Sequence, residues 1–305
     1  MKRDFLSLID LRPEEVVEVI ENAKAIKENR KKGKPSPQVL AGKAAALIFH
    51  KPSLRTRASF EVGVRELGGS SVYITDQEIS IGKREAISDV AKVMSRYFGL
   101  ICIRTFGHEI AVDLAKYASV PVVNMLTDLC HPCQVLCDML TIYEHLGRMK
   151  DLTITYLGDG NNITHSWLNM ASLLPMDLRI GTSAETLPSE AIVARTKKAG
   201  LSKITVTSDP IEAVKGADVV YTDVWASMGQ KHLADQKKKQ LAAFQINKKL
   251  LSHASKKAIV MHCLPANRGE EITDEVMDGP QSVVFDQAEN RLHGQKALIV
   301  KLFGG

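Results

Sequence analysis

The chain has 305 residues, of which 45% are hydrophobic and 25% are charged, close to the averages of soluble globular proteins. These values exclude a largely disordered or fibrous protein. A chain of this length exceeds what one hydrophobic core usually serves, so two domains are expected. The formal charge of +5 is modest, and the lysine and arginine runs contain no interleaved aromatic residues, which argues against nucleic acid as a partner and favours a small anionic ligand.

The chain contains no apolar run of the roughly 18 residues that suggest a membrane span, and its first residues lack the apolar stretch of a signal peptide. We therefore expect a cytoplasmic protein with no membrane partner. The five cysteines are an odd number in such a chain, so free thiols are expected rather than a disulfide framework.

Short apolar, β-branched segments alternate with segments of helical periodicity along the chain. This order predicts an α/β fold with two domains, each a parallel β-sheet flanked by helices. The strands expected in the first half are residues 44–49, 71–75, 100–104 and 120–124. Those expected in the second half are residues 152–157, 178–181, 204–207, 219–222, 258–262 and 283–285.

Two helices are expected to join the domains. Residues 132–147 have apolar side chains near the helical period, and Gly147 is a typical helix stop. Residues 288–303 predict a last helix that returns to the first domain. The predicted divisions are a first domain at 1–132, a linking helix at 133–148, a second domain at 149–287 and a C-terminal helix at 288–305.

Polar side chains follow several of the expected strands. Ser53 to Arg57 come after the first strand, and Arg104 ends the third. In the second half Asp223 and the segment His262 to Pro265 occupy the same kind of position. Ligands of open parallel sheets bind beyond the carboxyl ends of the strands, so we expect the two sets of strand ends to face one cleft.

The segment Ser53 to Arg57 combines two hydroxyls and two arginines at a predicted helix start. A helix N-terminus offers unpaired N–H groups and the positive end of the helix dipole, so the segment is suited to phosphate. An N-capping hydroxyl with solvated arginines is the alternative, and composition alone favours neither.

Four motifs resolve this ambiguity. Ser53-Leu54-Arg55-Thr56-Arg57 resembles the Ser-x-Arg-Thr-Arg motif of the aspartate and ornithine carbamoyltransferases, and His131-Pro132-Cys133-Gln134 resembles their His-Pro-x-Gln motif. The segments His262 to Pro265 and Asp223 to Gly229 match the His-Cys-Leu-Pro and Asp-x-x-x-Ser-Met-Gly motifs of the ornithine branch. The motifs stand in family order and span nearly the whole chain.

The resemblance implies transfer of the carbamoyl group of carbamoyl phosphate to the side-chain amine of ornithine, without a cofactor or metal. The residues implied to bind carbamoyl phosphate are Ser53, Leu54, Arg55, Thr56, Arg57, Arg104, His131, Gln134, Cys263, Leu264 and Arg291. Those implied to bind ornithine are Leu126, Asn162, Asp223, Ser227 and Met228. The catalytic residues implied are Arg57, Arg104, His131, Asp223 and Cys263.

The family's assembly is also implied, as a homotrimer or a larger assembly of trimers with active sites at subunit interfaces. Family members lend a loop to the neighbouring subunit, and residues 79–85 resemble that loop. The family often has Gln or His where this chain has the shorter Ser80. A direct contact from Ser80 is therefore in doubt.

Other interpretations remain open at this point. Cys130, Cys133 and Cys137 have spacing found in zinc sites, but no second Cys or His pair completes four ligands. The segment Gly158 to Asn162 is a partial dinucleotide fingerprint with Ile163 in place of its third glycine. The chain could also carbamoylate another amine, such as putrescine, or be a catalytically silent homologue.

Overall fold

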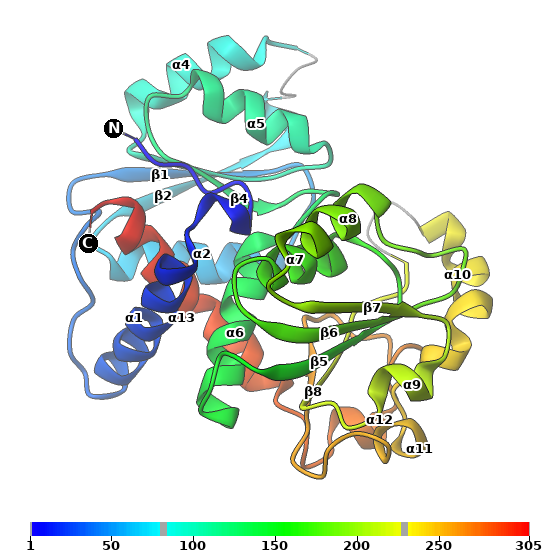
Figure 1. The fold of residues 1–305 in the computed structure, drawn as a ribbon. Coiled ribbons are helices and arrows are strands. Elements are labelled where there is room, and N and C mark those ends of the chain that lie inside the picture. The colour runs from blue at the N-terminus through cyan, green and yellow to red at the C-terminus, as the bar shows by residue number, and fades with distance from the viewer. Residues whose placement is uncertain (1, 80–83, 227–230, 305) are drawn as a thin grey trace. The chain divides into compact units, whose positions relative to one another are not determined.

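The computed structural model describes residues 2–79, 84–226 and 231–304 (Figure 1). The chain divides into two compact units. Unit 1 consists of Met1–Leu140 and Asn290–Gly305, and unit 2 consists of Thr141–Glu289. The division points fall inside two helices, α6 (Pro132–Leu146) and α13 (Val284–Leu302). The domain limits expected from the sequence stay a prediction.

Unit 1 is built on a four-stranded parallel sheet with strand order β2-β1-β3-β4. The strands are β1 (Ala44–Phe49), β2 (Ser70–Thr75), β3 (Leu100–Arg104) and β4 (Val122–Leu126). The inner strands β1 and β3 are buried almost throughout, as expected for apolar runs covered on both faces.

Helices cover both faces of this sheet. In Figure 1 α4 and α5 lie on one face, and α1, α2 and the end of α13 lie on the other. The elements of unit 1 outside the sheet, apart from α6 and α13, are η1 (Leu8–Asp10), α1 (Pro13–Lys31), α2 (Leu54–Glu66), α3 (Asp76–Ile79), α4 (Ile87–Tyr97) and α5 (His108–Tyr117). Apolar side chains of α4 and α5 pack on the sheet and form one continuous core.

Unit 2 is built on a five-stranded parallel sheet with strand order β7-β6-β5-β8-β9. The strands are β5 (Leu152–Leu157), β6 (Met176–Gly181), β7 (Lys203–Thr207), β8 (Val219–Thr222) and β9 (Ile259–His262). The strand order reverses between β5 and β8, which is where open sheets of this kind bind ligands.

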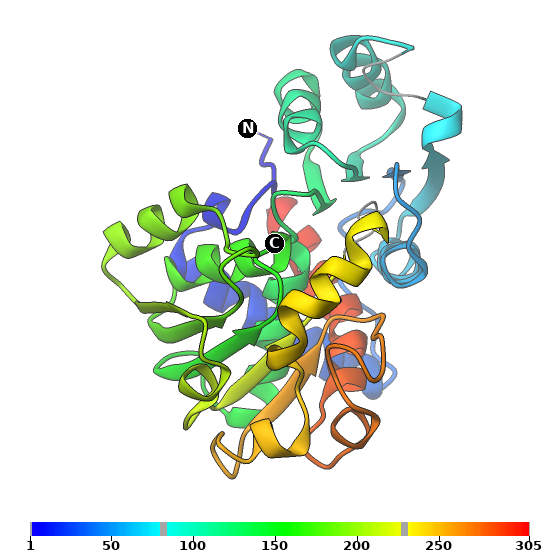
Figure 2. The ribbon, with the colours of Figure 1, turned by 90° about the vertical axis from the view of Figure 1, so that its right-hand side faces the viewer.

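The helices of unit 2 also cover both faces of its sheet, with α7 and α8 on one face and α9 on the other (Figure 1). The connection from β8 to β9 contains α10 and α11, which are yellow to orange in Figure 2. The elements are α7 (Asn162–Ala171), α8 (Glu190–Ala199), α9 (Pro210–Val214), η2 (Lys231–Leu233), α10 (Ala234–Leu241), η3 (Ala242–Phe244), α11 (Lys248–Leu251) and α12 (Asp274–Met277).

The predicted fold class is confirmed, since each unit has a parallel sheet flanked by helices. Four strands begin and end where the sequence predicts, and the other five differ by one or two residues. Among these five, β4 starts at Val122 rather than at residue 120. Pro121 precedes this strand and has no N–H to donate to a neighbouring strand. The first carbonyl of the strand, that of Val122, accepts from the Phe5 N–H at 2.8 Å.

The strand predicted at residues 283–285 is wrong. Ser282 forms only an isolated bridge to Val260, and α13 begins at Val284. The Gln287 N–H donates to the Val283 carbonyl at 2.9 Å, so this β-branched segment forms the first turn of a helix. Unit 2 therefore has five strands in the described residues rather than six.

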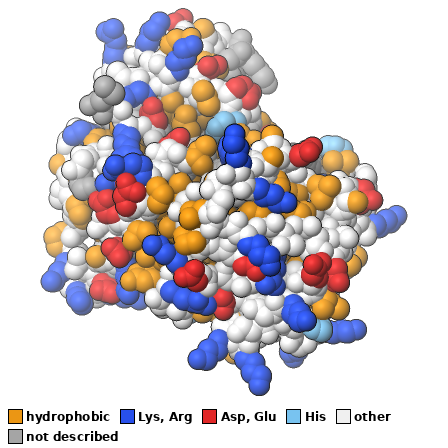
Figure 3. All heavy atoms as spheres, in the orientation of Figure 1, with side chains coloured by type: hydrophobic (Ala, Val, Ile, Leu, Met, Phe, Trp, Pro, Cys, Tyr) orange, Lys and Arg blue, Asp and Glu red, His pale blue; other side chains and the backbone are white. Residues whose placement is uncertain are grey.

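None of the helices formed by the described residues combines the length and the apolarity that crossing a bilayer requires. Acidic and basic side chains are interspersed on the face shown in Figure 3, with no field of one sign. This agrees with the modest formal charge of the chain.

A buried ion pair fastens α13 to α2 within unit 1. The Lys296 ammonium is fully buried and lies 2.6 Å from the Glu66 carboxylate, and it also donates to Ser36 Oγ at 3.2 Å. Burial by itself would raise the pKa of Glu66, but Lys296 and Arg30 outweigh it and lower that pKa below its ordinary value. Removing one partner of such a pair leaves the other charge buried and uncompensated.

We expect Glu66→Gln to lower the free energy of unfolding by about 2–3 kcal/mol, because the Lys296 ammonium would keep its burial and lose its counter-charge. The matched control is Glu275→Gln, which breaks an exposed pair with Lys248 and should cost less than about 1 kcal/mol. Urea unfolding of the two variants measures the difference. Equal losses would show that the buried pair has no special weight.

Candidate active site

The Ser53–Arg57 segment forms the start of a helix, as its sequence predicts. β1 ends at Phe49, and Ser53 is the extended N-cap residue of α2, with its Oγ accepting from the Thr56 N–H at 3.4 Å. Thr56 is fully buried, whereas Leu54 is 79% exposed. The segment therefore presents a helix N-terminus, with the positive end of the helix dipole, beside a buried hydroxyl.

Two arginines from distant parts of the chain converge on that hydroxyl. Arg104, at the end of β3, donates to Thr56 Oγ1 at 3.3 Å, and Arg291, from α13, donates to the same atom at 3.0 Å. All three side chains are buried. Arg291 forms no ion pair among the described residues, and its other side-chain partner is the Gln295 amide. Two buried guanidinium groups that share one neutral oxygen are suited to an anionic ligand.

His131 and Gln134 lie at the start of α6, which begins at Pro132 as predicted. His131 is buried, and burial followed by the charges of Arg291 and Arg104 lowers its pKa well below the ordinary 6.5. The imidazole is therefore neutral at physiological pH. Gln134 is 1% exposed, and its Oε1 has no hydrogen-bond partner among the described residues. Both residues offer polar atoms to a ligand beside the cationic groups.

Arg57 lies in a different setting from Arg104 and Arg291. Its side chain is 47% exposed, and its Nε donates to Glu61 one turn along α2 at 2.9 Å. Its guanidinium carbon stands 3.9 Å from the centroid of the Tyr73 ring. Arg57 must leave or share these partners to contact a phosphate, so its assignment stays a prediction. Leu126 ends β4, and its carbonyl already accepts from the Thr105 N–H at 3.0 Å.

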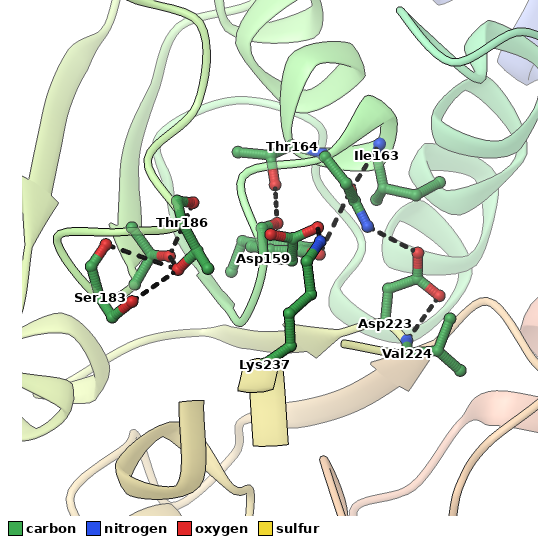
Figure 4. A network of polar contacts seen from close by, with 11 residues as sticks. Asp159, Ile163, Thr164, Ser183, Thr186, Asp223, Val224 and Lys237 are labelled. Atoms are coloured by element: carbon green, nitrogen blue, oxygen red, sulfur yellow. Dashed lines mark hydrogen bonds and ion pairs between the residues drawn. The ribbon is translucent and has the colours of Figure 1, made fainter. Parts of the chain in front are cut away.

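The centre of the site in unit 2 is Asp223, which directly follows β8 and is 7% exposed. Its Oδ1 accepts from the Val224 N–H at 2.8 Å and from the Cys263 thiol at 3.0 Å. Its Oδ2 accepts from Asn161 Nδ2 at 3.1 Å (Figure 4). The predicted residues Asp223 and Cys263 are thus brought together, and both carboxylate oxygens of Asp223 are held.

Asn161 was not among the residues predicted for the site. Its Oδ1 caps α7 by accepting from the N–H groups of Ile163 and Thr164 at 2.9 and 3.3 Å. One side chain thereby joins a helix N-terminus to the Asp223 carboxylate. The neighbouring Asn162, predicted to bind the acceptor, is half-buried at the first position of α7. The sequence pattern of an N-cap asparagine before α7 is a local signal for Asn161. The contact of Asn161 with Asp223 spans 62 residues, so the sequence does not indicate it.

A second group that the sequence did not reveal is the ion pair of Lys237 and Asp159, whose charged atoms lie 2.6 Å apart (Figure 4). Burial raises the pKa of Asp159, and Lys237 only partly offsets this. Such a pair adds little net stability because desolvation opposes the attraction. It does fix α10, which follows the predicted Ser-Met-Gly segment, to the loop after β5.

The loop after β5 is closed by its own chain rather than open to a pyrophosphate. The Gly160 N–H donates to the Thr186 carbonyl at 2.8 Å. A Cβ at Gly160 would lie 2.3 Å from the Pro188 nitrogen, so only glycine fits this close approach. The structure therefore gives the partial glycine motif a packing role, which disfavours the dinucleotide interpretation.

The His262–Pro265 segment is held by a buried histidine. His262 Nδ1 accepts from the Leu264 N–H at 2.9 Å, so its Nε2–H donates to Glu271 at 3.0 Å. Leu264 has a φ of +57°, a left-handed conformation that is costly for a residue with a Cβ. The hydrogen bond from Leu264 to His262 helps to hold this conformation. Strain of this kind tends to occur at functional sites.

Among the described residues, Asp223, His262 and Cys263 are the one group whose potential metal-ligand atoms lie within 4.8 Å of one another. Both ring nitrogens of His262 are already engaged, and Cys263 donates to Asp223. A metal would have to displace these bonds. Cys130, Cys133 and Cys137, which have zinc-like spacing, are buried free thiols and form no such group in the described part of the chain.

Three residues named from the sequence lie outside the described residues. They are Ser80, Ser227 and Met228.

Comparison with known protein families gives matches over nearly the whole chain. Residues 3–144 match the family described as "Aspartate/ornithine carbamoyltransferase, carbamoyl-P binding domain". Residues 150–302 match "Aspartate/ornithine carbamoyltransferase, Asp/Orn binding domain".

Individual relatives give the same result. The ornithine carbamoyltransferase of Syntrophus aciditrophicus is 48% identical over 98% of this chain and 99% of its own length. A protein of Pyrococcus furiosus named "Ornithine carbamoyltransferase, anabolic" is 46% identical over 99% of this chain and 97% of its own. A solved structure of the Pyrococcus furiosus ornithine carbamoyltransferase superposes with a TM-score of 0.94 at 46% identity, covering 100% of this chain and 98% of that one.

The low pKa of His131 predicts a pH dependence of stability. Below about pH 6.5 the unfolded chain takes up a proton at this histidine and the folded protein does not, so stability falls as the pH drops. The slope from one such group is about 1.4 kcal/mol per pH unit. His131→Asn should remove this part of the slope between pH 6.5 and 5, measured by urea unfolding in phosphate-free buffer.

The control is His253→Asn, which changes an exposed histidine and should keep the wild-type slope. A His131→Asn variant with the same slope as the wild type would contradict a neutral, buried imidazole.

Proposed function

The chain belongs to the aspartate/ornithine carbamoyltransferase family, and from this we propose that it transfers the carbamoyl group of carbamoyl phosphate to the side-chain amine of ornithine. The products are citrulline and phosphate. The name of the Pyrococcus furiosus relative supports a role in arginine biosynthesis. We also propose that unit 1 binds carbamoyl phosphate and unit 2 binds ornithine.

The observation that carries the donor site is the convergence of Arg104 and Arg291 on Thr56 at the start of α2. A phosphate dianion is a ligand that two converging, buried guanidinium groups would attract. The N–H groups at the start of α2 add neutral donors aimed at the same anion. The Ser53 hydroxyl and Arg55 complete the proposed phosphate contacts.

The acceptor site is supported by the fixed carboxylate of Asp223. Ornithine has two amines and one carboxylate, so its pocket needs an anionic group for an amine and amide or hydroxyl groups for the rest. Asp223 is held on both oxygens and can receive an ammonium or amine without reorganising. Cys263 and Asn162 are the proposed polar neighbours of the reacting and α-amino groups, with Ser227 and Met228 completing the pocket.

In the proposed reaction the neutral side-chain amine attacks the carbamoyl carbon, and the carbonyl oxygen becomes an oxyanion. Arg104 supplies a fixed cation for this oxygen, and the neutral His131 can donate one N–H to it. The C–O bond to phosphate then breaks, and phosphate leaves with the electron pair. The amine nitrogen passes one proton to the leaving phosphate, so the product is a neutral ureido group.

The decisive test is an assay of carbamoyl phosphate with a panel of acceptors, scored by ureido product. Ornithine should give citrulline with the highest kcat/KM, and putrescine, acetylated ornithine and aspartate should give far less. A preference for putrescine would show that the acceptor is another amine and not ornithine. No product with any acceptor, at intact carbamoyl phosphate binding, would indicate a catalytically silent homologue.

We propose a homotrimer or an assembly of trimers in the cytoplasm, with each active site at a subunit interface. Large apolar side chains that stay exposed on unit 1, such as Val72 on the edge strand β2 and Tyr97 at the end of α4, are suited to burial by a second subunit. A solution mass of three times 33.5 kDa, or a multiple of it, supports the proposal, and a monomeric mass would overturn it.

Arg57→Gly tests whether Arg57, which contacts Glu61 and Tyr73 in the structure, also binds the phosphate. If Arg57 contacts the phosphate during turnover, the variant should lose at least about 100-fold in kcat, as for other lost transition-state contacts. Arg65→Gly is a matched control, because Arg65 is exposed on the same helix and the glycine costs the helix about 1 kcal/mol in both. Near-normal turnover by Arg57→Gly would show that Arg57 has no catalytic contact with the phosphate and that its role is limited to its contacts with Glu61 and Tyr73.

Asp223→Asn and Cys263→Ala should damage the use of ornithine far more than the binding of carbamoyl phosphate. A charge-assisted hydrogen bond contributes roughly 1.5–3 kcal/mol, which corresponds to about 10- to 150-fold in kcat/KM for ornithine. Steady-state kinetics with each substrate varied in turn measures the split. If both variants keep the wild-type response to ornithine but lose affinity for carbamoyl phosphate, the acceptor has been assigned to the wrong residues.

A further inference from the structure

The side-chain amide of Gln134 makes a hydrogen bond through its nitrogen, and its oxygen, Oε1, has no hydrogen-bond partner among the described residues. The nitrogen, Nε2, donates to Asp138 Oδ1 at 2.9 Å. Both side chains are inside the protein, at 1% and 0% exposure. An unsatisfied buried carbonyl oxygen is costly, and it marks a place where a ligand donor would be welcome.

A side-chain amide can rotate by half a turn, which exchanges a donor for an acceptor at nearly the same place. An ionised carboxylate only accepts, so Asp138 favours the orientation in which Gln134 Nε2 points to it. The two residues are four apart on α6 and therefore lie on the same face of the helix. The hydrogen bond to Asp138 also polarises the amide and makes Oε1 a stronger acceptor.

The donor proposed for this protein has one feature that phosphate and acyl phosphates lack, namely an NH₂ group with two donors. We propose that Asp138 is a positioning residue that fixes the Gln134 amide with Oε1 available to this NH₂, and that the pair thereby selects carbamoyl phosphate over acyl phosphates of the same shape. This inference rests on the proposed function. Asp138 acts through Gln134 and is not itself expected to touch the donor.

The alternative role of Asp138 is purely structural, as one half of a helical i,i+4 pair. The two roles differ in one measurable quantity. A structural defect weakens every ligand of the phosphate site alike, whereas loss of positioning weakens only ligands that carry the NH₂. The ratio of two affinities separates the roles because shared contacts cancel in it.

The probes are phosphonoacetamide and acetonylphosphonate, which are stable and differ only by NH₂ in place of CH₃. Calorimetry on the full-length protein should show the wild type binding the amide at least about ten-fold more tightly, the size expected for a hydrogen bond to an otherwise unsatisfied buried acceptor. In Asp138→Leu this ratio should fall to within about three-fold of one, with binding of acetonylphosphonate kept. The affinity ratio of Asp138→Asn should lie between the ratios of the wild type and of Asp138→Leu.

The matched background is Gln134→Met, in which the ratio should already be near one and Asp138→Leu should change it no further. A wild-type ratio retained in Asp138→Leu would overturn the positioning role and leave the proposed function standing. If the wild type binds neither phosphonate, the proposed function itself fails and the inference with it. Tight but equal binding of both probes by the wild type would overturn only the inference.

Should the Asp138 variants not fold, the wild type can be tested directly by NMR with ¹⁵N-glutamine labelling, using Gln134→Met for assignment. One Nε2 proton of Gln134 should be strongly deshielded by the carboxylate and should stay so when phosphonoacetamide binds. An Nε2 signal that is ordinary in the free protein and shifts on binding would mean that Nε2 faces the ligand, and would overturn the proposal.

Discussion

Burial of positive charge around a single hydroxyl is the constraint on which the donor site depends. Arg104 and Arg291 reach Thr56 from residues 48 and 235 positions away, and water is excluded from all three side chains. The fold must hold these buried charges in place. Helix α13 contributes through its own ion pair, in which Lys296, five residues after Arg291 on the same helix, lies 2.6 Å from Glu66.

The same positive field explains the state of His131. Burial and the two guanidinium groups lower its pKa, so the imidazole stays neutral where a solvated histidine would begin to titrate. A neutral histidine adds no further repulsion to the site and still donates one hydrogen bond. When an anion binds beside it, part of the field is cancelled, and the cost of protonating the ring falls. The donor site thus couples ligand charge to the protonation of a residue that contacts the carbamoyl group in the proposed reaction.

The sequence predicted those parts of the fold and the site that depend on local order. The strand-turn-helix of Ser53 to Arg57 and the helix start at Pro132 follow from residues within one turn of each other. The strand at 283–285 was wrong because β-branched composition does not reveal that a helix begins at Val284, with the Gln287 N–H closing its first turn onto the Val283 carbonyl. The contacts of Asn161 with Asp223 and of Lys237 with Asp159 join segments 62 and 78 residues apart, and no spacing rule marks them. Motif resemblance named residue types, while the partners that orient them came only from the tertiary structure.

Orientation of a side chain or turn by a partner residue recurs in unit 2. Asp223 is held by Val224, Cys263 and Asn161, and the left-handed Leu264 is held by His262, which is itself fixed by Glu271. In each case a neighbouring residue removes the free rotation of a residue in the candidate site. Such holding contacts have little net effect on stability when they are buried and polar, since desolvation opposes them. Their effect appears instead in the reaction, because groups already fixed in the free protein need not reorganise as charge develops on the substrate.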